Sequence, residues 1–247
     1  TSTAPVGAQF NGPSYKVSAT ATSGLTVTFT IDASAASVCS ISGSTVSFIG
    51  AGTCVIDADQ AGDANWNAAP QVQQSFAVAK ADQTISFTST PPVNALVGGA
   101  TYTVTATATS SLPVTFTVDA SAASVCSIAG TTVSFIGGGT CLIDANQAGN
   151  ANYNAAPQAP HSFVVNQNHQ TITFTSTAPG SAKNAGPTYT VTATASSGLT
   201  VAFTIDASSA SVCSIAGSTV SFIGAGTCVI DANQAGNAAY NAAPQVQ

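Results

Sequence analysis

The sequence predicts an all-β protein built from three tandem copies of one unit. The first observation is a recurrence: Cys39, Cys126 and Cys213 lie 87 residues apart, and a second set of cysteines follows the same spacing. The second is that apolar residues alternate with Thr and Ser over short stretches, which is the period of strands with one buried face. The third is that Gly-, Ser- and Pro-containing pairs interrupt this alternation at short intervals, with no sustained 3.6-residue period.

Seven short strands are expected in each unit, and alternation supports each in turn. The first, Gln83–Thr88, places Ile85 and Phe87 on one face. The second is Tyr15–Ala21, and the third, Leu25–Asp32, has the cleanest alternation of apolar residues with Thr. The remaining strands are expected at Val38–Ile41, Thr45–Ile49, Thr53–Ala58 and Ser75–Val78.

Seven strands separated by turns within about 87 residues are the pattern of an immunoglobulin-like β-sandwich. A β-solenoid is the rival repeat fold, but its rungs recur at about 20–30 residues. We therefore expect three seven-stranded sandwiches, with boundaries near Lys80–Gln83 and Gln167–Gln170. The three domains are expected at residues 1–81, 82–168 and 169–247, called repeat 1, repeat 2 and repeat 3 below.

Repeat 2 is the complete unit, and the other two are truncated. Repeat 1 lacks the five residues equivalent to Gln83–Phe87, which belong to its expected first strand. Repeat 3 lacks nine residues at its end, including the equivalent of the last strand, Ser162–Val165. The sequence is therefore expected to be a segment of a longer array.

Three runs in repeat 2 carry a resemblance: Val125–Ile128, Gly139–Ala145 and Gln147–Tyr153. They are similar to the bacterial Ig-like repeats that occur in tandem in very large cell-surface and secreted proteins. The similarity extends over all three units. It implies a stalk, a spacer or an adhesin shaft, and it fixes no single activity.

The six cysteines allow 15 pairings, and their constant spacing favours one. Cys39 shares a face with Ile41, and Cys54 with Ile56, so both side chains are expected to point into one core. A zinc site is the alternative, but a C-x14-C pair without a recurring His is unlike zinc-ligand spacing. The expected disulfides, which place the protein outside the cytosol, are Cys39–Cys54, Cys126–Cys141 and Cys213–Cys228.

The charge content excludes whole classes of partner. Only 5% of the residues are charged, against roughly 25% in ordinary domains. Three Lys or Arg residues cannot neutralise the phosphates of a nucleic-acid interface. No run of 18 uninterrupted apolar residues is present, because Thr, Ser, Gly or Asn breaks every one. We therefore expect no nucleic-acid partner and no direct insertion into a membrane.

Candidate chemical sites are weak in every unit. Asp32 and Asp57 recur and could act as a pair of catalytic carboxylates, but Asp32 is better placed to cap a turn and Asp57 is expected on an outward position. The stretch Asp57–Asp63 resembles a calcium loop only in repeat 1, because Asn replaces two of its carboxylates elsewhere. His161 and His169 are expected to be surface substitutions. We expect no catalytic residue, no cofactor and no metal site.

One aromatic position recurs after the sixth strand, occupied by Trp66, Tyr153 and Tyr240. An exposed ring there could stack on a sugar, whereas a packed ring would anchor the loop. Exposed rings would favour an adhesive module that binds glycans or a partner protein. Packed rings would favour a structural role.

The sequence as a whole predicts a structural, non-catalytic protein at the cell surface or outside the cell, as a stalk or filament. Its expected partners are neighbouring repeats of the same long chain. Few charges weaken the repulsion that keeps proteins apart, so self-association into fibres is also expected.

Overall fold

The computed structural model describes the whole chain, Thr1–Gln247, and the expected all-β class is confirmed: its only helices are three one-turn 3-10 helices. No helix here has the length and apolar character needed to span a bilayer. The chain divides into two compact units. The first comprises Thr1–Thr88, Thr105–Thr115 and Ala145–Ala159; the second comprises Ser89–Val104, Phe116–Asp144 and Pro160–Gln247.

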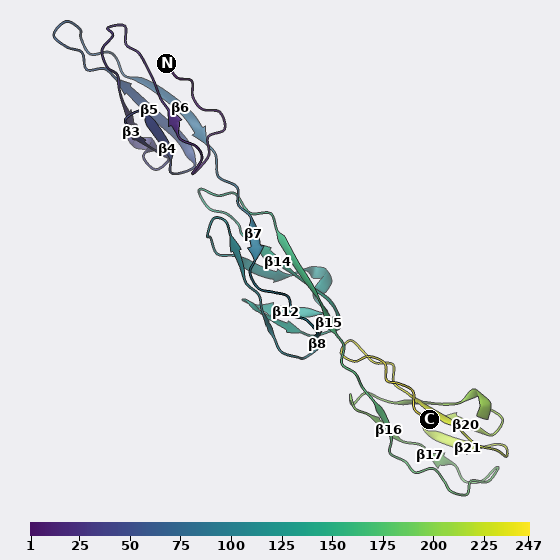
Figure 1. The fold of residues 1–247 in the computed structure, drawn as a ribbon. Helices are drawn as coiled ribbons and strands as arrows, with labels where there is room; N and C mark the ends of the chain where they lie inside the picture. Colours follow the sequence, from purple (N-terminus) through teal and green to yellow (C-terminus); the bar gives the residue numbers. More distant parts are fainter. The chain divides into compact units, whose positions relative to one another are not determined.

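Repeat 1 forms two antiparallel three-stranded sheets, in the orders β1-β4-β3 and β2-β5-β6 (Figure 1). Val46 and Phe48 from the first sheet and Ile56 and Val78 from the second share one buried core. Its elements are β1 (Tyr15–Lys16), β2 (Thr28–Ile31), η1 (Ala33–Ala35), β3 (Cys39–Ser42), β4 (Thr45–Phe48), β5 (Gly52–Asp59) and β6 (Val72–Val78).

Repeat 2 contains nine strands in three sheets, in the orders β10-β7, β12-β13-β9 and β11-β14-β15-β8. The pairing of β15 with β8 is parallel, and the other pairings given for this repeat are antiparallel. The elements are β7 (Ile85–Phe87), β8 (Ala95–Leu96), β9 (Tyr102–Thr103), β10 (Ala106–Ala108), β11 (Thr115–Val118), η2 (Ala120–Ala122), β12 (Cys126–Ala129), β13 (Thr132–Phe135), β14 (Gly139–Asn146) and β15 (Ala159–Asn166).

Repeat 3 has the sheet orders β16-β18, β17-β21-β20 and β19-β22. Its last strand has four residues, whereas its equivalents β5 and β14 have eight, because no third strand pairs with it along its length. The elements are β16 (Ile172–Phe174), β17 (Tyr189–Thr190), β18 (Ala193–Ala195), β19 (Ala202–Ile205), η3 (Ala207–Ser209), β20 (Cys213–Ala216), β21 (Thr219–Phe222) and β22 (Ile230–Asn233).

The strand expected at Tyr15–Ala21 and its equivalents is not one strand. In repeat 2 it divides into β9, which pairs with β13, and β10, which pairs with β7. The chain passes from one sheet to another at Val104, which is fully buried. In repeat 1 only Tyr15–Lys16 is a strand, since Ala19–Ala21 has no neighbouring strand to pair with.

Three disulfides lie in equivalent places, Cys39–Cys54, Cys126–Cys141 and Cys213–Cys228. In repeat 1, Cys39 belongs to β3 and Cys54 to β5, so the bond joins the two sheets across the core. The bond in repeat 2 likewise joins β12 to β14.

Candidate interaction surfaces

The recurring Asp at the end of the third expected strand caps a turn, as the sequence predicts. Asp32 precedes η1, and its Oδ1 accepts hydrogen bonds from the Ser34 backbone N–H at 2.8 Å and the Ser34 hydroxyl at 2.5 Å. The Ser34 hydroxyl and then the Ser34 backbone amide lower the pKa of Asp32. Asp119 and Asp206 have the same partners and the same lowered pKa in their own repeats.

Asp57 lies on the outward face of its strand, as expected, since its cross-strand neighbours Thr30 and Gln73 are exposed, but its side chain is covered there. Asp57, Asp144 and Asp231 are each only 7% exposed. In repeat 1 the side chain of the cross-strand neighbour Gln73 covers the carboxylate, and its Nε2 donates to Asp57 Oδ1 at 2.9 Å. The same amide lies 3.5 Å from Asp32 Oδ2. The two carboxylates therefore share one glutamine amide, which gives them a structural partner.

Repeat 2 has Pro160 in place of that glutamine. Burial, followed by the nearby Asp119 carboxylate, raises the pKa of Asp144. No group of three or more His, Cys, Asp or Glu side chains is arranged to hold a metal ion. The stretch that resembles a calcium loop serves another purpose, because Asp63 Oδ1 accepts from the backbone N–H groups of Asn65 and Trp66.

His161 is a substitution at a partly exposed position, where its ring also packs against an aromatic ring. Its ring stacks on Tyr102 at 6.1 Å, and its Nε2 lies 3.1 Å from the Tyr102 hydroxyl. In repeat 1 the equivalent Gln74 plays the same part, since the Tyr15 hydroxyl donates to its Oε1 at 2.8 Å. Burial lowers the pKa of His161.

A pH dependence follows from His161. Its pKa is lower in the folded chain than the ordinary 6.5, so the neutral ring contributes stability above that value, and this contribution is lost as the pH falls through the folded pKa. We expect the wild-type chain to melt at a lower temperature at pH 5 than at pH 7. The variant His161→Gln has the residue that repeat 1 carries at this position. In calorimetric scans its melting temperature should fall less between pH 7 and pH 5 than that of the wild type. An equal fall in melting temperature in both proteins would show that His161 does not contribute to the pH dependence.

The recurring aromatic position has two different environments. Tyr153 is half-buried, and its ring meets Phe10 edge-on at 5.3 Å. Its backbone forms a parallel bridge with Ala81, and Tyr240 forms the equivalent bridge with Asn168. Trp66, by contrast, is 52% exposed. The two tyrosines therefore lie beside the preceding linker, whereas Trp66 has no such neighbour.

The linkers themselves are held by the turn of the following repeat. The Ala81 N–H donates to Asn152 O, and the Asn154 N–H donates to Ala81 O, both at 2.9 Å. Lys80 Nζ donates to Asn150 O at 2.7 Å. The linker before repeat 3 makes equivalent bonds to Asn237 O, Ala239 O and the Asn241 N–H. Each linker is thus structurally part of the repeat that follows it.

The same turns also contact the preceding repeat within each compact unit. The Ala51 N–H donates to Asn152 Oδ1 at 3.0 Å, and the Gly138 N–H donates to Ala238 O at 2.8 Å. Asn168 Nδ2 adds a bond to Val97 O at 3.0 Å. A junction is therefore built from backbone groups and asparagine side chains of three segments.

A buried glutamine ties each linker to its repeat. Gln83 is 2% exposed, and its Nε2 donates to Gln147 Oε1 at 2.5 Å and to Asn154 O at 2.6 Å. The Ser110 hydroxyl donates to the Oε1 of the same side chain. The equivalent network in repeat 3 consists of Gln170, Gln234, Asn241 and Ser197.

No protein-family model matches the sequence, and no curated protein is significantly similar to it. Among solved structures, the chain resembles Drosophila N-cadherin EC1-3 at 10% identity over 93% of this chain and 92% of the other, with a TM-score of 0.35. It resembles domains 1-6 of surface layer protein SbsC at 18% identity over 86% and 34% of the two chains (TM-score 0.29). A C-terminal 282-residue fragment of intimin, in complex with the intimin-binding domain of the translocated intimin receptor, has 14% identity over 60% and 54% (TM-score 0.25). Likenesses of this size assign no function.

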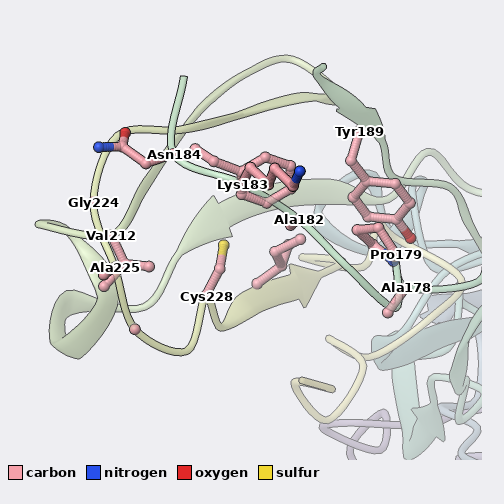
Figure 2. Close-up of a pocket in the computed structure, with 13 residues that line it drawn as sticks. Ala178, Pro179, Ala182, Lys183, Asn184, Tyr189, Val212, Gly224, Ala225 and Cys228 are labelled. Carbon is pink, nitrogen blue, oxygen red and sulfur yellow. The ribbon is translucent and has the colours of Figure 1, made fainter. Parts of the chain in front are cut away.

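Repeat 3 has an open cavity of about 470 Å³ beside its disulfide. In Figure 2 the Cys228 side chain lies between the segment carrying Ala182 and Lys183 and the turn carrying Gly224 and Ala225. In the other two repeats the equivalent cysteine is fully buried, and a neighbouring strand pairs along that edge, β6 in repeat 1 and β15 in repeat 2. Cys228 is only partly buried because repeat 3 has no such strand.

We expect the Cys213–Cys228 bond to be reduced before the other two, because a reductant must reach a sulfur atom. Brief treatment with a dilute thiol, alkylation and peptide mass spectrometry should find label on Cys213 and Cys228 first. The Cys126–Cys141 bond, whose two residues are 1% and 0% exposed, serves as the internal control. Simultaneous labelling of all three pairs would contradict this expectation.

Sequence reasoning missed the buried glutamines. Gln83 and Gln170 open the recurring pattern Gln-Thr-Ile, and Gln147 and Gln234 open Gln-Ala-Gly. A long polar side chain that recurs unchanged beside strands was the available signal. Such a residue is expected to be exposed by composition alone, and only its paired partner explains its burial.

Proposed function

We propose that this chain is a structural, non-catalytic segment of an extracellular bacterial surface protein, forming part of a stalk or filament. In this proposal each 87-residue repeat is a seven-stranded immunoglobulin-like sandwich, if β9 and β10 of repeat 2 count as one strand and the two-residue β8 is left out. The repeats at 82–168 and 169–247 follow the first without free linkers. The observation that supports it most is that each linker is hydrogen-bonded into the next repeat. A stalk needs such junctions because a chain with flexible linkers between its domains would not hold its far end at a fixed distance. The disulfides support a place outside the cytosol.

Small-angle X-ray scattering of the whole chain tests this proposal. The double variant Tyr153→Ala, Tyr240→Ala truncates the two residues whose backbones form bridges with the linkers, and it should broaden the distribution of interatomic distances. Trp66→Ala is the matched control, because Trp66 occupies the same position but lies beside no linker. If the wild-type chain already scatters as a flexible string, and the double variant scatters identically, the stalk function is wrong.

Self-association into fibres is the second part of the proposal. Ile49, Ile136 and Ile223 occupy one position in the three repeats and are 46%, 49% and 52% exposed. A large apolar side chain exposed at a constant interval offers the same contact to a like chain in each repeat. Sedimentation velocity over rising protein concentration should show assembly, and the triple variant to Ser should reduce it. A wild-type chain that stays monomeric at all concentrations would disprove association.

An adhesive module is the alternative, and the exposed Trp66 is the observation that favours it. Tyr153 and Tyr240 do not, since both are half-buried beside linkers. Trp66 is the sole tryptophan, so its fluorescence reports directly on a ligand at this place. Titration with a panel of glycans should shift that emission if the domain is an adhesin, and the stalk function predicts no shift.

A further inference from the structure

The linker before repeat 3 differs from the linker before repeat 2 at every position. Residues 79–82 are Ala-Lys-Ala-Asp, whereas the equivalent residues 166–169 are Asn-Gln-Asn-His. In the six residues that follow each linker, the two repeats differ only at Ser86, which is Thr173 in repeat 3. The change is therefore confined to the linker. It replaces two charged residues and two alanines by three carboxamides and an imidazole.

These side chains belong to a cavity at the junction of repeats 2 and 3. The cavity has a volume of about 630 Å³, and all of its lining residues lie within the second compact unit. The linker contributes Asn166, Gln167 and His169 to the lining, repeat 2 contributes Asn94, and repeat 3 contributes Asn241. No Asp, Glu, Lys or Arg is among the lining residues. The cavity is thus surrounded by groups that form hydrogen bonds but carry no fixed charge.

Much of this hydrogen-bonding capacity is directed to solvent. Asn94, Asn166 and His169 are exposed, and their side chains make no hydrogen bond to the rest of the chain. Gln167 is partly buried, and its Nε2 donates to Asn237 O at 2.5 Å, which orients the amide and leaves its Oε1 as an acceptor. A ligand can therefore bond to these groups by replacing water, without breaking a contact within the protein.

At the first junction the equivalent side chains bond to each other. Asn154 Nδ2 donates to Asp82 Oδ1 at 2.8 Å. In repeat 3 His169 stands in place of that carboxylate, and Asn241 is the equivalent of Asn154. Asn241 Nδ2 instead lies 3.5 Å from Gln167 O, which is a long and weak hydrogen bond. The amide that is engaged at the first junction is available to a ligand at the second.

A glycine makes room for one of the lining side chains. Gly138, which also lines the cavity, replaces the alanine found at Ala51 and Ala225. A Cβ added at Gly138 would lie 2.4 Å from Gln167 Cγ, so an alanine here would force the Gln167 side chain to move. The departures from the repeat at positions 138 and 167 are therefore structurally coupled, and both concern this cavity.

The lining selects an uncharged ligand that is rich in hydroxyl groups. A carboxamide presents a donor and an acceptor side by side, and a sugar hydroxyl both donates and accepts. No charged lining residue is present to pair with an ionic ligand. Leu96, which is 44% exposed and lines the same cavity, adds an apolar surface for the C–H groups of a sugar ring.

We propose that the cavity at the junction of repeats 2 and 3 is a binding site for a neutral saccharide. The amides of Asn94, Asn166 and Gln167 bond to its hydroxyl groups, and Leu96 packs against its C–H groups. This site is separate from Trp66 of repeat 1. It does not depend on the stalk function, because a stalk and an adhesive module could both carry it.

A titration of the whole chain followed by NMR tests the proposal, with cellobiose, lactose and N,N'-diacetylchitobiose as probes. The side-chain NH₂ signals of Asn166, Gln167 and Asn241 should shift along a saturable curve with at least one of these sugars. Asn154 is the internal control, because it is the equivalent of Asn241 but is bonded to Asp82. The absence of a saturable shift with all three sugars would overturn the proposal, and so would equal shifts at Asn154 and Asn241.

Hydrogen exchange gives a second readout at the junction. The Asn168 N–H donates to Ala239 O at 2.8 Å, and this bond joins the linker to the turn that carries Asn241. A ligand that contacts the linker and both repeats stabilises the closed junction, so exchange of the Asn168 amide should slow as the sugar saturates. Exchange of the Ala81 amide at the first junction should stay unchanged. Equal slowing at both amides would indicate a general solvent effect and would contradict a specific site.

Variants with residues from the other junction make the test specific. The double variant Asn166→Ala, His169→Asp introduces the residues present at positions 79 and 82, so it should melt at an unchanged temperature but bind about tenfold more weakly. Leu96→Ala should also weaken binding. Val164→Ala is its matched control, because Val164 is 58% exposed but lies outside the lining. Undiminished binding by the double variant would overturn the proposal.

A sulfated disaccharide tests the expected neutrality of the ligand. It should bind no more tightly than its unsulfated parent, because the lining offers no cation to the sulfate group. Tighter binding of the sulfated sugar would overturn the assignment to neutral saccharides.

Discussion

Reduction of the disulfides is expected to lengthen the unfolding step of repeat 2 by about 50 Å when single chains are pulled at their ends. While Cys126 and Cys141 are bonded, the residues between them cannot extend. The two cysteines are separated by 15 positions, and an extended chain spans about 3.4 Å per residue. Force spectroscopy with and without a reductant measures the difference. Steps of equal length in both conditions would mean that the bond carries no load.

The same bond should dominate the equilibrium stability of its repeat. Closing a loop of this size contributes about 3 kcal/mol by restricting the unfolded chain. The double variant Cys126→Ala, Cys141→Ala should therefore unfold at a clearly lower denaturant concentration. Both side chains are almost fully buried, so Ala also leaves a small cavity, and the variant with Val at both positions controls for lost volume. A change below about 1 kcal/mol would contradict the role given to the bond.

Replacing Gly149 by Ala should destabilise the turn that holds the linker by about 2–4 kcal/mol. Gly149 has a φ of 76°, and an added Cβ would lie 2.4 Å from Tyr153 O. The unfavourable φ and the crowding against Tyr153 O both act on the turn whose backbone is hydrogen-bonded to Ala81. Chemical unfolding of the whole chain, monitored by exchange at the Ala81 amide, measures the loss.

Gly130→Ala is the matched control for this substitution. Gly130 also has a positive φ, 61°, but an added Cβ would meet nothing within 4 Å. It should therefore show only the backbone cost, about 1–2 kcal/mol, with the Ala81 amide still protected. Equal effects of the two variants would show that crowding against Tyr153 is unimportant.

Alternation of side chains was sufficient to locate the central strands of each repeat. Thr45–Phe48 lies within the expected Thr45–Ile49, and Gly52–Asp59 contains the expected Thr53–Ala58. The pattern was insufficient at Tyr15–Ala21, because a chain that changes sheets keeps its alternation while its hydrogen-bonding partner changes. The alternation of side chains shows which face of a strand is apolar, but it does not show which strand lies beside it.

The polar sites were harder to predict for a related reason. The expected capping by Asp32 is local, within two residues, and is confirmed. The burial of Asp57 on the outward face was not predicted, because Gln73, 16 positions away in sequence, covers it. The buried Gln83 depends on Gln147, which is 64 positions away. Partners so far apart along the chain become visible only once strand pairing is known.

The hydrogen bonds that hold Ala81 and Asn168 couple the thermodynamics of adjacent repeats. Since each linker belongs to the fold of the repeat that follows, the melting of one repeat releases groups that its neighbour also uses. Stability in such an array is a sum of intrinsic terms and nearest-neighbour terms. Internal repeats should then melt at higher temperatures than terminal ones, and adding repeats should raise the cooperativity of the transition as well as the number of folded domains.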